Sequence, residues 1–137
     1  MSTSVGAAPE RRLLFRVLAC AGALCAIAIA FRYLVIERQA IAEFCEAGGA
    51  PWWCAIREGI IVTFYSDAVG IVSLAMAVLA LLMYGRLSGR FWSIAAIVWA
   101  APSIVLYSAD YAVPAFLLAL VMLVRDLLRA PGVRPAL

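Results

Sequence analysis

Long apolar runs constrain this chain more than any other feature of its sequence. Four runs fit helices, and they cover residues 13–36, 60–84, 91–107 and 111–128. A hydrocarbon layer about 30 Å thick needs about 20 helical residues to cross it, so each run suits one crossing. A composition of 67% hydrophobic and 14% charged residues fits a membrane protein and no soluble class of this size. We therefore predict an all-α integral membrane four-helix bundle.

Short connections between the runs set the predicted topology. Residues 85–90 join the second run to the third, and residues 108–110 join the third to the fourth. Helices joined by so few residues pack as antiparallel hairpins. The longer segment 37–59 separates the first two runs, and we expect both helices to extend beyond the membrane into it. The helical pattern resumes at Cys54 and continues into the second run without a breaker.

The placement of arginine predicts the orientation in the membrane. If the tails 1–12 and 129–137 are cytoplasmic, eight arginines lie inside and three outside. The inside set is Arg11, Arg12, Arg16, Arg86, Arg90, Arg125, Arg129 and Arg134, and the outside set is Arg32, Arg38 and Arg57. This bias follows the positive-inside rule. We predict a multi-pass protein of a bacterial-type inner membrane, with both termini cytoplasmic and residues 37–59 forming a periplasmic hairpin tip.

Missing residue types narrow the chemistry that the chain can perform. It contains no His, which excludes haem ligation through imidazole, a histidine general base and a histidine metal site. The net charge of +3 follows from the topology and does not indicate binding of nucleic acid. We predict no catalytic residue, no metal site and no required cofactor, with the lipid bilayer as the first partner.

Two cysteines bracket the loop at the end of the external hairpin. Cys45 follows Arg32 by 13 residues, and Cys54 precedes Asp67 by 13 residues. If the two helices are antiparallel and the cysteines meet at the tip, Arg32 and Asp67 lie at equal height. The count predicts a Cys45–Cys54 disulfide and an ion pair, or close approach, between Arg32 and Asp67. An oxidising periplasm allows this disulfide, which should contribute about 2 to 3 kcal/mol.

The same cysteine pair has a redox interpretation. Catalytic couples are usually spaced Cys-x-x-Cys, whereas eight residues intervene here, which favours a structural disulfide. Residues 54–58, Cys-Ala-Ile-Arg-Glu, resemble the start of the second helix in the quinone-linked disulfide oxidases of the bacterial inner membrane. In that family a cysteine pair and a nearby Arg begin this helix. This chain lacks the family's close-spaced pair and its second external cysteine pair, so we do not assign it to the family.

Small residues and tryptophans mark candidate contact surfaces. Small side chains let helix backbones approach closely in lipid, and they form one stripe on the first helix and one on the third. The stripes are Ala19, Gly22, Ala23 and Ala26, then Ser93, Ala96, Ala100 and Ser103. Trp52 and Trp53 are either anchors at the membrane interface or a contact surface for a partner, with Arg57 and Glu58 beside them.

These features favour a non-catalytic accessory or scaffold subunit of a larger inner-membrane complex. A transporter or channel needs polar groups along a path through the membrane, and the centres of the four runs offer almost none. One alternative is a thiol–disulfide or quinone-linked oxidoreductase that uses Cys45 and Cys54. Another is a small proton-coupled transporter that uses Asp67. The sequence leaves open the partner complex, the oligomeric state, and whether lipid or quinone is bound.

Overall fold

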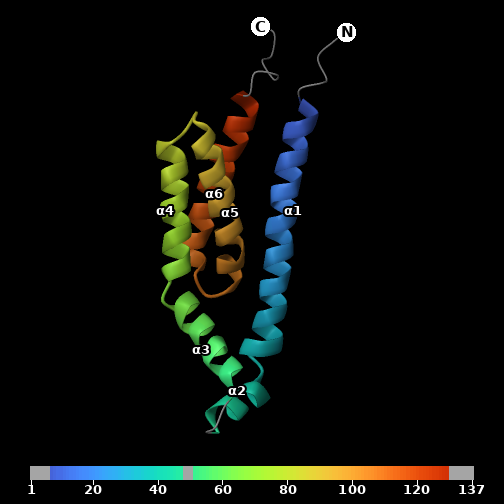
Figure 1. Ribbon diagram of the computed structural model, residues 1–137, viewed down its shortest axis with the longest axis vertical. Coiled ribbons are helices and arrows are strands. Elements are labelled where there is room, and N and C mark those ends of the chain that lie inside the picture. The colour runs from blue at the N-terminus through green and yellow to red at the C-terminus, as the bar shows by residue number, and fades with distance from the viewer. Residues whose placement is uncertain (1–6, 48–50, 130–137) are drawn as a thin grey trace.

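The computed structural model describes residues 7–47 and 51–129, and all regular structure in these residues is helical (Figure 1). Its elements in order are α1 Ala7–Phe31, a π-helical segment η1 Arg32–Ile36, α2 Gln39–Glu46, α3 Trp52–Tyr65, α4 Ala68–Leu82, α5 Leu87–Val105 and α6 Ala109–Arg129. The prediction of an all-α protein is confirmed.

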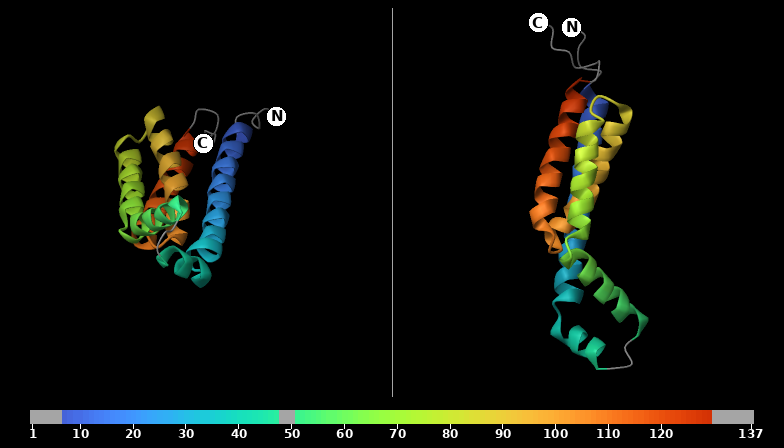
Figure 2. Two further views of the ribbon diagram at one scale, coloured as in Figure 1. Left: turned by 60° about the horizontal axis from the view of Figure 1, so that its bottom comes forward. Right: turned by 90° about the vertical axis from the view of Figure 1, so that its left-hand side faces the viewer.

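Three helices form the centre of the fold, and a fourth lies beside them. α4, α5 and α6 pack against one another, while α1 packs chiefly against α5. Figure 1 shows the start of α1 and the end of α6 at the same end of the molecule, with α2 and α3 at the opposite end. In the right-hand view of Figure 2, α2 and α3 project as a hairpin beyond the other helices.

Small residues on α5 make the close packing possible. The predicted stripe on this helix is buried, with Ala96, Ala100 and Ser103 at 0% exposure and Ser93 at 2%. The buried hydroxyls are satisfied within their own helix, because Ser93 donates to Gly89 O at 3.0 Å and Ser103 donates to Trp99 O at 2.7 Å. A serine on this face therefore brings no unsatisfied polar group into the core.

Two helical stretches of the described chain are long and apolar enough to cross a membrane, Pro9–Ile36 and Ala109–Arg129. The pair α3 and α4 would supply a third crossing, although the two helices meet at a bend of 52°. α5 is not among these stretches, since Arg90, Pro102 and three serines interrupt its apolar sequence. These stretches indicate a membrane protein, while the full set of four crossings stays a prediction.

The second predicted helix, residues 60–84, is not continuous. α3 ends at Tyr65, and Asp67 adopts a left-handed backbone conformation with φ of 59° before α4 begins. In a straight helix, Phe64 O would accept the amide of the residue four positions later. Here the buried Ser108 hydroxyl donates to Phe64 O at 2.6 Å. A serine 44 residues away thus makes the shorter bond to this carbonyl, which also accepts from the amide of Asp67 at 3.3 Å.

The first helix is also interrupted where a straight extension was expected. α1 passes into η1, whose backbone bonds join residues five apart, and the amide of Glu37 donates to Arg32 O at 2.9 Å. The chain then turns at Glu37 and Arg38 before α2 begins at Gln39. The hairpin tip is therefore made from α2 and α3. A break separates α2 from η1, and another separates α3 from α4.

The central position of α5 can be tested by substitution. We expect Ala96→Leu to destabilise the chain by about 1 to 3 kcal/mol, because added atoms enter a closely packed core. Ala23→Leu makes the same change at an exposed position on α1 and should cost less than about 0.5 kcal/mol. Unfolding of both variants in mixed micelles, followed by circular dichroism, measures the difference. Equal losses of stability would contradict a core built around α5.

Candidate functional site

The tip of the molecule is closed by the predicted disulfide. Cys45 lies in the last turn of α2 and Cys54 in the first turns of α3, and their Cα atoms are 5.6 Å apart across the bonded sulphurs. The neighbouring rings of Phe44 and Trp53 stack in parallel, with centroids 5.9 Å apart. Residues 48–50 lie outside the described residues. The disulfide and the aromatic stack together hold α2 against α3.

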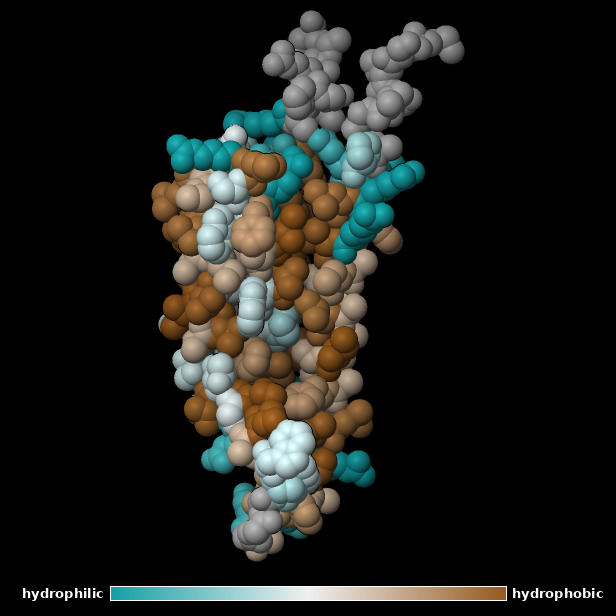
Figure 3. All heavy atoms as spheres, in the orientation of Figure 1, coloured by the Kyte–Doolittle hydropathy of each residue, from teal (hydrophilic) through white to brown (hydrophobic). Residues whose placement is uncertain are grey.

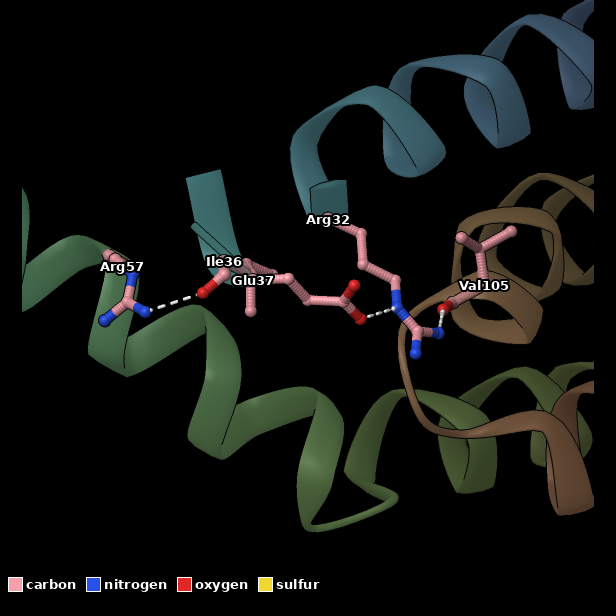
Figure 4. A network of polar contacts seen from close by, with 5 residues as sticks. All are labelled: Arg32, Ile36, Glu37, Arg57 and Val105. Atoms are coloured by element: carbon pink, nitrogen blue, oxygen red, sulfur yellow. Dashed lines mark hydrogen bonds and ion pairs between the residues drawn. The ribbon is translucent and has the colours of Figure 1, made fainter. Parts of the chain in front are cut away.

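Arg57 fastens α3 to the end of the π-helical segment. Its Nη2 donates to Ile36 O at 2.8 Å (Figure 4). Its Nε donates to Val35 O at 3.3 Å. The last carbonyls of a helix have no partner within the helix, so they need donors from elsewhere. Arg57, predicted as a candidate for partner contact, is thus engaged by the backbone of its own chain.

Arg32 makes the corresponding connection to the central helices. Its Nη1 donates to Val105 O, in the last residue of α5, at 2.8 Å, and its Nε pairs with Glu37 Oε1 at 2.6 Å (Figure 4). Its guanidinium carbon also lies 4.5 Å from the centroid of the Tyr107 ring. One side chain therefore links the end of α1, the turn at Glu37 and the end of α5.

The predicted ion pair between Arg32 and Asp67 is not formed. Arg32 pairs with Glu37 instead, and in the part of the chain that the structure describes no ion pair includes Asp67. The prediction assumed that two straight helices would place these residues at equal height. The chain turns after Ile36, and Glu37 lies beside Arg32. Asp67 lies at the 52° bend between α3 and α4, so the helix that contains it is not straight.

Three of the four predicted contact residues are exposed at the tip, namely Trp52, Trp53 and Glu58. Trp52 is 77% exposed, while Trp53 is 37% exposed and is partly used in the stack with Phe44. A surface hollow of about 420 Å³ adjoins both cysteines, and Trp52 and Glu58 form part of its rim. The exposed surface around the hollow is therefore mainly aromatic and acidic, because Arg57 is half-buried and donates to the backbone of η1.

The small-residue stripe predicted on the first helix faces away from the rest of the protein. Its four members, Ala19, Gly22, Ala23 and Ala26, are all exposed. α1 instead uses Val17, Ala21 and Ala28, on the opposite side, to contact its own chain. Figure 3 shows mainly brown and tan surface along α1 on the right-hand side. The stripe is thus left uncovered by this chain.

Sequence reasoning missed two residues that hold the site together. The apolar pattern places Ser108 in a connecting turn and Glu37 in the hairpin tip and predicts no contact for either. Ser108 is fully buried and bonds to Phe64 O, whereas Glu37 neutralises Arg32. A polar residue in a three-residue turn between apolar runs was the only available signal for Ser108. Its partner is a backbone carbonyl, which leaves no trace in a sequence.

The described residues offer limited reaction chemistry. Within residues 7–47 and 51–129, no group of three or more His, Cys, Asp or Glu side chains is arranged to hold a metal ion. The disulfide is the one group at the tip that can exchange electrons, and Cys54 is only 7% exposed. A thiol attacking this bond would have better access to Cys45, which is half-buried.

Loss of the Arg57 contacts should loosen the tip. We expect Arg57→Gln to cost about 2 kcal/mol locally, because two carbonyls at the end of η1 lose charged donors. Amide exchange in residues 32–46 should accelerate in this variant. Arg38→Gln, which removes an exposed arginine from the same region, is the control. Exchange rates that are the same in both variants would show that Arg57 does not fasten α3 to η1.

Removal of the disulfide should lower stability without changing the helical content. We expect the double variant Cys45→Ser/Cys54→Ser to lose about 2 to 3 kcal/mol, since a short loop is no longer closed. Cys20→Ser on the exposed face of α1 is the matched control. Unfolding with and without reductant measures both variants. The wild type in reductant should behave like the double variant, and a wild type insensitive to reductant would contradict this role.

Comparison with known proteins does not assign the chain to a family. No protein-family model matches the chain, and neither a curated protein nor a solved structure is found to be similar to it. The features that bear on function are the closed tip, the two arginines bonded to backbone carbonyls and the uncovered stripe on α1.

Proposed function

We propose that this protein is a non-catalytic accessory subunit of a larger complex in a bacterial-type inner membrane. In this proposal it crosses the membrane four times, with both termini in the cytoplasm and the disulfide-closed tip in the periplasm. Partner helices bind along α1, and a partner's outer domain binds at the tip. The observation that carries the proposal is the uncovered small-residue stripe on α1.

Two similar stripes have different surroundings in this chain. On α5 the stripe is buried among α4, α6 and α1. The helices beside it are also close, because at Gly70 on α4 a Cβ would lie 3.1 Å from Ser108, in the turn before α6, and from Tyr111 on α6. At Gly22 on α1, a Cβ would meet nothing within 4 Å. Small side chains bring no benefit against fluid lipid, but they allow another helix to approach closely. This contrast supports a helix from another subunit as the partner of α1.

The exposed part of the tip supports a second contact. Trp52 is the most exposed aromatic ring of the tip, and Ile56, one turn along α3, is 52% exposed. Exposed tryptophan beside an apolar residue is typical of the central residues of protein interfaces. The disulfide and the Arg57 contacts fix the position of this surface before a partner arrives. A fixed surface loses less conformational entropy on binding.

The distribution of arginine supports the orientation. Seven described arginines lie in the first turns of α1, around the start of α5 and in the last turns of α6, all at one end of the molecule (Figure 1). They are Arg11, Arg12, Arg16, Arg86, Arg90, Arg125 and Arg129. Of the arginines that the structure describes, only Arg32, Arg38 and Arg57 lie toward the tip. By the positive-inside rule, this distribution supports a tip outside the cytoplasm.

The second candidate is a thiol–disulfide or quinone-linked oxidoreductase, and the hollow beside Cys45 and Cys54 is the observation that favours it. Two other observations favour the accessory subunit instead. Arg57 also lines the hollow, but its Nε and Nη2 already donate to Val35 O and Ile36 O, which leaves fewer of its donors for a thiolate or a quinone. Cys54 is buried, which restricts attack on its sulphur.

The contacts do not favour the proton-coupled transporter either. Asp67 lies at the bend between α3 and α4. The buried serines Ser73, Ser93 and Ser103 each donate to a carbonyl of their own helix, so they do not form a path for protons.

Substitution on the uncovered stripe tests the proposal. We expect the tagged wild type, purified in mild detergent from its native membrane, to bring along a stoichiometric membrane partner. Gly22→Leu/Ala23→Leu should lose that partner, since the bulkier side chains keep a second helix away. Ala75→Leu, at an exposed alanine of α4, should keep it.

Two results would contradict the accessory-subunit proposal. The first is a wild type that purifies alone with bound quinone, which would favour the oxidoreductase. The second is a partner that the Gly22→Leu/Ala23→Leu variant retains as fully as the wild type does. To separate the two functions directly, Cys45→Ser/Cys54→Ser should lower stability but leave the activity of the partner complex intact. A loss of electron transfer together with a wild-type disulfide that is readily reduced would support the redox candidate.

A further inference from the structure

Two exposed arginines at the start of α1 line a hollow that the proposed function does not use. Arg12 and Arg16, one helical turn apart, border an open depression of about 470 Å³ together with Pro9 and Leu13. Both arginine side chains are exposed. Figure 3 shows hydrophilic side chains over this end of α1, above mainly apolar surface. Two positively charged side chains thus lie next to apolar surface at the start of α1.

The two positive charges have no acidic partner within the described residues. The ion pairs found there are Arg90 with Asp126 at 3.1 Å and Arg32 with Glu37 at 2.6 Å. Like charges one turn apart on a helix repel each other. An anion between Arg12 and Arg16 would remove that repulsion, and guanidinium groups match the geometry of a phosphate.

The position of the hollow at the start of an apolar helix favours a phospholipid over a free anion. The apolar stretch Pro9–Ile36 begins at the hollow, so Arg12 and Arg16 lie where that helix would enter the membrane. The same helix face continues through Cys20, which is exposed, to Ile27, which is 64% exposed. An acyl chain can lie along this face while its phosphate reaches the arginines. A free phosphate would gain nothing from the apolar surface.

We propose that Arg12 and Arg16 form a site for the phosphate of an anionic phospholipid, with one acyl chain lying along α1 past Cys20. The site does not depend on a partner subunit or on the redox state of the tip. Each arginine near a membrane surface strengthens the binding of anionic lipid by about five-fold. Occupation of the site would seat the start of α1 in the headgroup layer.

Lipid binding to the purified full chain tests this proposal. The protein in neutral detergent is titrated with phosphatidylglycerol or with phosphatidylcholine of the same acyl chains, and bound lipid is counted by native mass spectrometry. We expect phosphatidylglycerol to bind more tightly. Arg12→Gln/Arg16→Gln should weaken its binding on the order of twenty-five-fold and abolish the preference. Arg12→Lys/Arg16→Lys keeps the charge and should keep the preference.

A charge-matched control separates a defined site from general attraction. Arg86→Gln/Arg125→Gln removes two exposed arginines from the same end of the molecule and should leave the binding of phosphatidylglycerol unchanged. Equal weakening in both double-Gln variants would overturn the proposal, because attraction would then be diffuse. Equal binding of the two lipids by the wild type would also overturn it. So would inorganic phosphate that binds as tightly as the lipid.

Discussion

Close approach of helix backbones along α5 is the interaction on which the rest of the structure depends. Ala96, Ala100 and Ser103 have no exposed surface, and they lie where α4, α6 and α1 meet α5. Between helices in lipid, van der Waals contact replaces the hydrophobic effect, so helices associate where small side chains let them touch. The serines add no unsatisfied hydroxyl, since each bonds to its own helix. α5 is therefore central, although it is not among the stretches that are long and apolar enough to cross a membrane.

Helix interruptions shape the other end of the molecule, and each is stabilised by a side chain distant in sequence. Ser108 donates to Phe64 O at the bend before α4. Arg57 donates to Ile36 O at the end of η1, and Arg32 donates to Val105 O at the end of α5. Carbonyls left free at helix ends need donors, and few donors exist in an apolar chain. Using arginine and serine in this way turns α2 and α3 into a hairpin whose aromatic surface is held in place.

Sequence reasoning succeeded where the argument was local or symmetrical and failed where it assumed straight helices. The equal spacing from Arg32 to Cys45 and from Cys54 to Asp67 correctly placed the two cysteines together. The same count wrongly paired Arg32 with Asp67, because the breaks at Glu37 and Asp67 change the direction of both helices. The stripe on α5 is buried and the stripe on α1 is exposed, although both have the same composition and spacing.

By itself, the sequence determined the helical class, the membrane character of its apolar stretches and the meeting of Cys45 with Cys54, because length, hydropathy and spacing carry that information. Only the tertiary structure decided which face of α1 is covered, where the helices break and which carbonyls the arginines engage. In a water-soluble helix, polar residues mark the outer face. In a membrane helix both faces are apolar, so the pattern cannot separate a face that meets its own chain from one that meets lipid or a partner.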